Sequence, residues 1–284
     1  MKGLKKLALA SAVALAPFAA QADLKALNDD AMGDVTGQAG VTIELETKID
    51  IGEVRYQDEG FFTLKGVHLG GQNDADPANS FSDADGDGSF DGVVSALNDV
   101  KIDIDIEANG DAVIDVTNTD GNGSPIDFAM LIEEVGLESQ DGAETTLLAS
   151  NITMVGNLSR MNLTVDNSED ALNIDVGFNI TDMDMDIDFL GIGIRNLQVY
   201  GSDYLEETAA GGATSASALY ANATFGLSKA AGAAPGGNDA LAISVSDISM
   251  DVIVEEIIIG GANIGSLTFD DLVISETSLV VYGR

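Results

Sequence analysis

The stretch LTFDDLVI, Leu267–Ile274, sets two apolar residues at alternating positions on each side of a central polar pair. Alternation with a period of two is typical of a β-strand that has one buried and one solvated face. The central pair shifts the phase of this alternation, so a straight strand would turn its second half to the wrong face. A bulge or bend at the pair restores a single apolar face. The stretch therefore predicts a bent β-strand.

The same pattern recurs along the chain at irregular intervals. Its other copies are IDIGEVRY (Ile49–Tyr56), FTLKGVHL (Phe62–Leu69), FNITDMDM (Phe178–Met185), IGIRNLQV (Ile192–Val199), ISVSDISM (Ile243–Met250) and VIVEEIII (Val252–Ile259). A β-solenoid-like body and a bent β-sandwich both suit such strands, and the sequence leaves the two open. We predict an all-β fold built from elongated, bent or bulged strands.

The N-terminus indicates export. MKGLKK is followed by the apolar run LALASAVALAPFAA and by Ala20-Gln21-Ala22. A positive start, a short apolar run and an A-x-A site predict a signal peptide over residues 1–22, with cleavage before Asp23. The run is too short to span a bilayer. We expect a secreted protein at the cell surface or in the extracellular space, with the periplasm as the alternative.

The composition excludes several classes of function. The formal net charge is −36, which argues against a nucleic-acid partner because phosphate binding needs clustered Lys and Arg. Hydrophobic residues make up 45% of the chain, enough to build a folded body, and there is no cysteine for disulfides or thiolate chemistry. Aromatic residues are 5% and tryptophan is absent, so we do not expect an integral membrane protein. Association with the outer membrane stays open.

Three segments follow from the distribution of residues. Residues 23–40 carry Leu24, Leu27 and Met32 near helical spacing, which predicts a short helical, interaction-prone segment. Residues 41–284 form the expected β-rich body. Within it, 73–92 is a calcium-type loop region, and the Gly/Ala-rich stretch 208–239 is expected to be loop, interrupted by a strand at LYANATFGL.

The sequence SDADGDGSFDG, Ser82–Gly92, is the clearest candidate site. Its oxygen-bearing side chains fall at the spacing of a calcium loop, and Gly88 stands where such a loop needs a sharp turn. The candidate ligands are Asp83, Asp85, Asp87, Ser89 and Asp91. Position 12 is Val94 instead of a bidentate Glu, so we expect a structural Ca²⁺ site and not a sensor. A solvated acidic loop is the alternative.

Other polar residues point less strongly to a site. Asp182, Asp184, Asp186 and Asp188 alternate along one predicted strand, and we interpret them as its exposed face, with a cation-binding ladder as the alternative. His68, the only histidine, is expected to be an exposed strand residue. No G-x-S-x-G motif accompanies it, and 48 acidic residues make any one carboxylate pair uninformative. We therefore expect no enzyme and assign no catalytic residue.

The start of the expected mature chain carries a motif, L-x-D-D-x-x-M-x-x-V-T-G-Q-A-G. Its residues are Leu27, Asp29, Asp30, Met32, Val35, Thr36, Gly37, Gln38, Ala39 and Gly40. The motif resembles a poorly characterised family of secreted Gram-negative surface proteins, some of which are described as components of a pilus-like filament system. The resemblance implies a cell-surface or filament-associated role and brings no catalytic residue.

These observations together predict a secreted structural or adhesive protein of the cell surface. We expect a filament (pilus-like) component that is stabilised by calcium and that associates with itself or with other surface proteins. The alternative is a monomeric periplasmic or extracellular protein that binds calcium or another ligand. The two differ in whether the purified chain polymerises.

Overall fold

Alternating apolar residues make long strands in the computed structural model, which describes residues 40–73, 76–86, 89–211 and 214–283. The predicted signal peptide and short helical segment lie before the described residues, except for Gly40 at their start. The elements are β1 (Val41–Thr47), β2 (Ile49–Gln57), β3 (Phe61–Gly70), the 3-10 turn η2 (Pro77–Asn79), β4 (Phe81–Ser82), β5 (Gly92–Val93), β6 (Leu97–Ile106), β7 (Ala112–Asn118), β8 (Ile126–Glu138), β9 (Thr145–Asp166), β10 (Ala171–Ile187), β11 (Ile192–Tyr200), α3 (Tyr204–Ala210), α4 (Ala216–Leu219), β12 (Ala221–Ala234), η3 (Pro235–Gly237), β13 (Asn238–Ile259) and β14 (Ala262–Val281).

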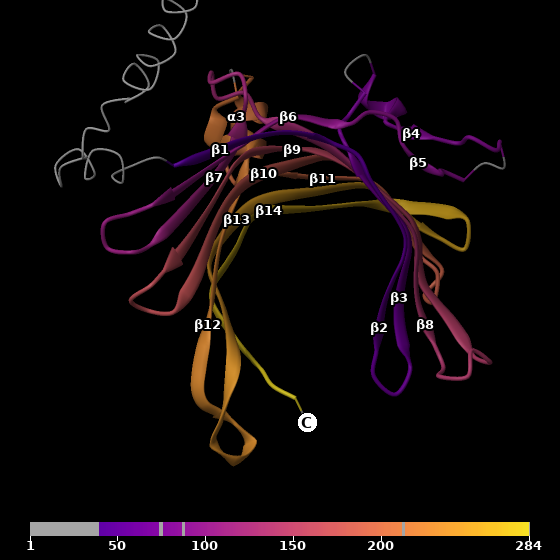
Figure 1. The fold of residues 1–284 in the computed structure, drawn as a ribbon. Helices are drawn as coiled ribbons and strands as arrows, with labels where there is room; N and C mark the ends of the chain where they lie inside the picture. Colours follow the sequence, from indigo (N-terminus) through magenta and orange to yellow (C-terminus); the bar gives the residue numbers. More distant parts are fainter. Residues whose placement is uncertain (1–39, 74–75, 87–88, 212–213, 284) are drawn as a thin grey trace, which may run out of the picture. The chain divides into compact units, whose positions relative to one another are not determined.

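Within the described residues, twelve strands form one antiparallel sheet, and β4 and β5 form a separate pair (Figure 1). The prediction of an all-β fold is confirmed. The hydrogen bonding joins the twelve strands in a single layer, an arrangement that differs from both finer alternatives, the solenoid-like coil and the two-sheet sandwich. The strand pairing is antiparallel throughout, so neighbouring strands alternate in direction across the sheet.

The sheet has two halves that share four long strands. One half has the order β1-β6-β7-β9-β10-β12-β13-β14. The other has the order β2-β3-β8-β9-β10-β11-β13-β14. For example, β9 pairs with β8 up to Leu158 and with β7 from Met161 onward. The sheet bends where the long strands change partners (Figure 1).

The central polar pairs of the repeated pattern coincide with interruptions of the strand ladders. The register passes over a residue or shifts at Gly52-Glu53, Lys65-Gly66, Thr181-Asp182, Arg195-Asn196, Ser246-Asp247, Glu255-Glu256 and Asp270-Asp271. Three of these residues have a positive φ: Gly66 at 55°, Asn196 at 49° and Asp271 at 54°. The prediction of bent or bulged strands is therefore confirmed, and each bulge keeps apolar residues on one face.

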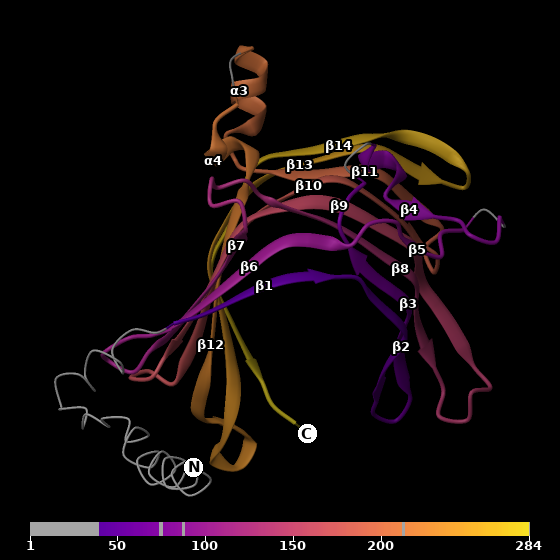
Figure 2. The same ribbon diagram turned by 45° about the horizontal axis from the view of Figure 1, so that its top comes forward.

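The core is small and lies at the bend. Two excursions of the chain, one with β4 and β5 and the other with α3 and α4, lie on the outer, convex side of the sheet (Figures 1 and 2). Val93 of β5 packs with Ala129 and Val155 of the sheet, and Phe81 of β4 packs against this cluster. Near the two helices, Ala218 and Ala221 are also fully buried. The two excursions thus bury the outer face only near the bend.

The Gly/Ala-rich region 208–239 is more ordered than its composition predicts. The prediction of loop there is wrong over 228–234, because β12 continues to Ala234; along its length β12 pairs with β10 on one side and β13 on the other. The expected strand at LYANATFGL is present from Ala221 onward. Alanine and glycine have low strand propensity, but two flanking strands supply hydrogen bonds that offset it. The helices α3 and α4 precede β12 and were not predicted.

Candidate functional site

The predicted calcium loop is the tip of the β4–β5 hairpin. Asp83, Asp85 and Asp91 are exposed, and a carboxylate oxygen from each lies within 4.8 Å of the others. Asp91 Oδ2 accepts hydrogen bonds from the backbone N–H of Ala84 at 2.6 Å and of Asp85 at 3.3 Å. These bonds fix the loop in a tight turn. Ser89 is exposed, and Asp87 lies outside the described residues.

The flanks of this loop are short strands and not helices, so the loop is held differently from a helix–loop–helix calcium site. Phe81 before the loop and Val93 after it pack against Ala129 and Val155 of the sheet. Asp91 N–H donates to the carbonyl of Ser82 at 2.7 Å, and Val94 N–H donates to that of Ser80 at 2.8 Å. The geometry of the acidic tip is therefore linked directly to the placement of the core cluster.

A second acidic cluster joins Asp251, Asp270 and Asp271. Asp251 is completely buried, while the other two are exposed. The two oxygens of Asp251 accept backbone hydrogen bonds at 2.9 Å, one from Asp271 and one from Leu205. Asp251 thereby ties α3 and the β14 bulge to β13. The repeated pattern marks Asp270 and Asp271 as a bulge pair but does not reveal this cluster, because Asp251 lies between two other copies of the pattern, Ile243–Met250 and Val252–Ile259.

The aspartates of β10 are partly buried, and their surroundings shift the pKa values of Asp182 and Asp186 in opposite directions. Burial, with the charges of Asp184 and Glu255, raises the pKa of Asp182. Burial also acts to raise the pKa of Asp186, but hydrogen bonds from Arg195 and Asn151 outweigh it and hold that pKa below its ordinary value. Arg195 Nη2 lies 2.6 Å from Asp186 Oδ1. Asp188 is exposed in the turn after β10.

His68 is not the exposed residue that its strand position predicts, because 88% of its side chain is covered and only 12% is exposed. Gly92 of β5 lies against its ring. His68 Nδ1 is 2.6 Å from Asp50 Oδ1, and Nε2 is 3.5 Å from Glu133 Oε1, too far for a well-formed hydrogen bond. The contact with Gly92 of the β4–β5 hairpin is one that strand periodicity does not reveal.

The outer face carries a polar row across one half of the sheet. The row, in register from strand to strand, is Thr42, Asp103, Asp115, Asn162, Asp175, Thr224, Asp247 and Ser275. Thr42 donates to Asp103, Asn162 to Asp115 and Thr224 to Asp175, at 2.6–2.7 Å. Neutral donors thus separate most of the acids, which limits repulsion between like charges on neighbouring strands.

The opposite side of the sheet, which we call the inner face, is apolar. One row in register is Val41, Ile104, Ile114, Leu163, Ile174, Phe225 and Val245. A row in the other half is Ile49, Leu69, Met130, Met154 and Met183. Large side chains here stay open to solvent: Val41 is 55% exposed and Phe269 is 45% exposed. Contiguous apolar surface of this extent is typical of an interaction site.

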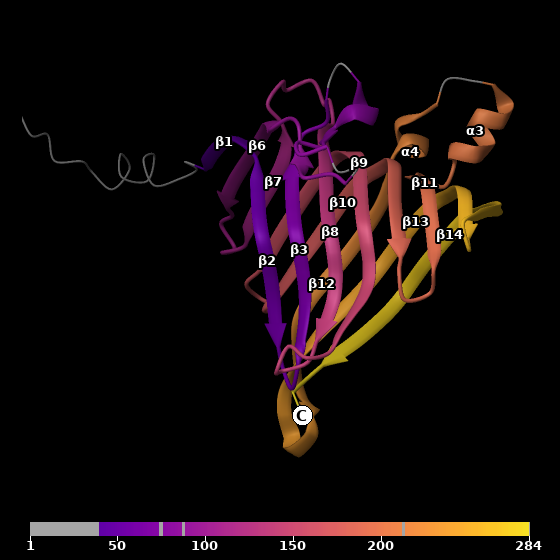
Figure 3. The ribbon, with the colours of Figure 1, turned by 90° about the vertical axis from the view of Figure 1, so that its right-hand side faces the viewer.

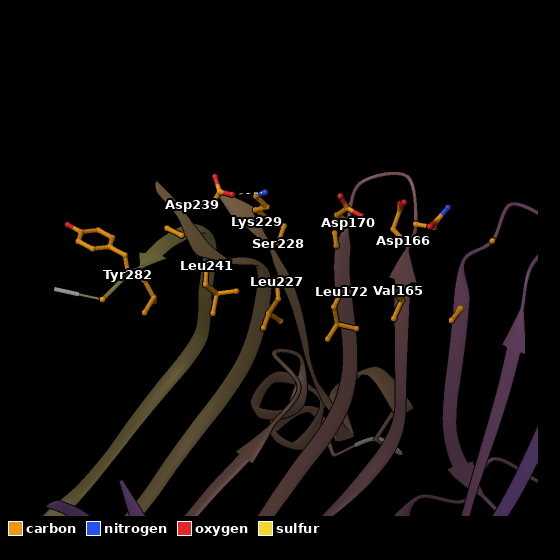
Figure 4. A pocket seen from close by; sticks show the side chains of 17 residues that line it. Val165, Asp166, Asp170, Leu172, Leu227, Ser228, Lys229, Asp239, Leu241 and Tyr282 are labelled. Atoms are coloured by element: carbon orange, nitrogen blue, oxygen red, sulfur yellow. Dashed lines mark ion pairs between the residues drawn. The ribbon is translucent and has the colours of Figure 1, made fainter. Parts of the chain in front are cut away.

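The inner face has a hollow near the turns that join β9 to β10 and β12 to β13. The hollow has a volume of about 850 Å³. Val165, Leu172 and Leu227 lie directly opposite one another on adjacent strands, and Leu241 of β13, opposite Lys229, also lines the hollow (Figure 4). Charged residues stand at the rim, where Lys229 Nζ pairs with Asp239 Oδ2 at 2.6 Å. The hollow therefore presents an apolar floor and a charged border.

Comparison with family models finds a match for the first part of the chain. Residues 1–108 match the model of a family described as "Family of unknown function (DUF6160)". The match covers less than half of the chain, and the description names no activity. No curated protein and no solved structure matches the chain. Of the helices in the described part of the chain, none has the length and apolar character needed to cross a lipid bilayer.

Proposed function

We propose that this chain is a secreted structural protein of the cell surface, a subunit of a pilus-like filament that assembles through its open sheet. The observation that carries the proposal is the inner face, an apolar surface on a single-layer sheet. A sheet with one apolar face normally buries it against a second layer of structure. Within the described residues, no second layer covers this face, so a neighbouring subunit or another surface protein supplies it.

The acidic outer face fits the same role. A net charge of −36 keeps an exported protein solvated and monomeric until its apolar surface meets a partner. Repulsion between copies falls as salt or divalent cations screen the charges. Assembly is therefore expected to depend on ionic conditions, with little polymer at low salt.

Calcium is proposed as a structural clip of the β4–β5 hairpin. Asp83, Asp85 and Asp91 offer hard carboxylate oxygens, which Ca²⁺ prefers. A bound ion would hold the tip closed and thereby hold Phe81 and Val93 on the sheet. The role is stabilisation of the fold and not catalysis.

The rival function is that of a monomeric binding protein in the periplasm or outside the cell. The hollow lined by Val165, Leu172 and Leu227 is the observation that favours it, because an apolar ligand could fill this space. Such a protein would remain monodisperse at every protein concentration, and its ligand would copurify with it.

The test is the state of the protein recovered after secretion from a Gram-negative host. Sedimentation velocity and negative-stain microscopy are recorded with 5 mM Ca²⁺, with chelator and at two salt concentrations. The proposal expects elongated polymers whose fraction rises with protein concentration. A monodisperse monomer under all of these conditions, at concentrations up to the solubility limit, contradicts it and favours the binding protein.

A further inference from the structure

The sheet has two long edges that differ in character. One edge is formed by β1 and β2, which follow each other with only Lys48 between them. The other edge is β14, and Figure 3 shows the two edges on opposite sides of the sheet. In the described part of the chain, β1 pairs only with β6, β2 only with β3 and β14 only with β13. Each edge therefore leaves a row of backbone donors and acceptors to water or a partner.

The two edges are matched in length and direction. The pair β1–β2 spans Val41–Gln57, and β14 spans Ala262–Val281, so each is roughly 55–65 Å long at about 3.3 Å per residue. Strands alternate in direction across each half of the sheet, which is eight strands wide. With an even number of strands, β1–β2 of a second copy in the same orientation runs antiparallel to β14. Pairing between copies would therefore be antiparallel, like every pairing within the sheet.

The interruptions of the ladders give a register for this pairing. The pairing of neighbouring strands skips one residue in each of β2, β3, β8 and β9, and these skipped residues lie side by side: Gly52, Gly66, Glu133 and Asn151. Farther across the sheet, the pairing of β11 with β13 skips Asn196 and Glu255 in the same way. In β14 the residue passed over next to Glu255 is Ser266, between Gly265 and Leu267. Continuing the line into a second copy sets its Gly52 opposite Ser266.

This register matches side chains as well as bulges. Counting along the antiparallel strands from Gly52 and Ser266 sets Ile51 opposite Leu267 and Ile49 opposite Phe269. These four belong to the inner face and are 39–45% exposed. The same count sets Lys48 opposite Asp270, an exposed pair of opposite charge on the outer face.

From this agreement of direction, bulge position, apolar face and charge, we propose that β14 of one copy pairs antiparallel with β1 and β2 of a second copy. The inference rests on the proposed function and names the contact within the filament. It joins copies head to tail, a heterologous contact that can repeat without closing. The inner faces of successive copies then form one continuous apolar surface, which a facing layer of subunits covers in the proposed filament.

The first test uses the absence of cysteine from the chain. The variant Lys48→Cys/Asp270→Cys of the full chain is assembled, oxidised and run on a denaturing gel. We expect a ladder of disulfide-linked oligomers. The control Lys48→Cys/Thr277→Cys places the second thiol farther along β14, and it should give a ladder at least tenfold weaker. Circular dichroism and melting curves establish that both variants are folded.

A charge exchange provides a second measurement that needs no new covalent bond. Lys48→Glu should raise the protein concentration needed for half-assembly by about two- to fivefold, the range expected of an exposed ion pair. Lys48→Glu/Asp270→Lys should restore it, because the opposite charges are exchanged between the two edges.

The outcomes separate the inference from the function on which it rests. Polymers with equal ladders for the two cysteine pairs, or with no recovery in the charge exchange, would overturn the edge pairing and leave the filament intact. If the unmodified chain forms no polymer and neither pair cross-links, both the filament and the edge contact are wrong.

Discussion

At the residue scale, Asp251 is the side chain whose loss the fold should tolerate least. It is fully buried, and each of its oxygens accepts one backbone N–H. In Asp251→Asn the amide NH₂ would face one of these donors, so a buried N–H loses its partner. We expect a loss of about 1–3 kcal/mol in the free energy of unfolding, measured by urea denaturation.

Asp270→Asn is the matched control for this substitution, since Asp270 belongs to the same cluster but is exposed. Its stability should change by less than about 0.5 kcal/mol. If both variants lose the same stability, the cluster acts through its total charge and the hydrogen bonds of Asp251 are not the cause.

Asp182 and Asp186 should respond to pH in opposite ways. The pKa of Asp182 is raised in the folded protein by burial and by nearby acids, so its stabilising contribution is present at low pH and is lost as pH rises. The pKa of Asp186 is lowered: although burial acts against this, hydrogen bonds from Arg195 and Asn151 prevail. Its contribution is present above its ordinary pKa of 3.8 and is lost as pH falls.

The two asparagine variants should therefore change the melting temperature in opposite directions at pH 7. Asp182→Asn should raise the melting temperature, and Asp186→Asn should lower it. Both differences should shrink when the melts are repeated near pH 3, because Asp182 is then protonated in the folded protein and both carboxyl groups take up protons in the unfolded chain. Two variants that shift the melting temperature in the same direction at pH 7 would contradict the assignment.

At the scale of the element, the β4–β5 hairpin links the acidic loop to the core. If its Kd for Ca²⁺ is about 1 mM, 10 mM Ca²⁺ stabilises the fold by about 1.4 kcal/mol, which raises the melting temperature by roughly 3–6 °C. Asp85→Asn should abolish most of this rise, and Asp188→Asn, an exposed acid in another turn, should preserve it. Differential scanning fluorimetry with Mg²⁺ as a second control measures both. A rise that is equal for the two variants would mean that Ca²⁺ screens the general charge.

The bent strands could be predicted from the sequence because the cause is local. A pair of residues such as Asp270-Asp271 between two alternating runs forces a phase change, and only a bulge keeps the apolar face continuous. The choice of a single sheet could not be predicted in this way. It depends on which distant strands pair, and β9 and β13 each change partner midway.

The candidate site was predicted only where its residues are neighbours in the sequence. Asp83, Asp85 and Asp91 lie within one short loop, and they do come together. Asp251 meets Asp271 through pairing of β13 with β14, and His68 lies against a hairpin more than twenty residues away. Such contacts arise from tertiary packing, which leaves no periodic signal in a single sequence.

At the scale of the whole molecule, the described residues make a sheet that is solvated on one face and apolar on the other. Its buried hydrophobic cluster is confined to the bend, around Val93, Ala129 and Val155. A fold with so small a core is expected to gain much of its stability from association, because binding to the folded state alone shifts the folding equilibrium. The melting temperature should therefore rise with protein concentration.

The most direct measurement of this account is thiol labelling of the two faces in the dispersed and the assembled protein. Leu279→Cys places the single thiol on the inner face, and Ser278→Cys places it on the outer face of the same strand. Both positions are exposed, so both should react rapidly with a maleimide in the dispersed chain. We expect assembly to slow labelling at position 279 at least tenfold and to leave position 278 nearly unchanged. Equal reactivity at position 279 in the two states would show that the inner face stays open in the polymer, and the central claim would be wrong.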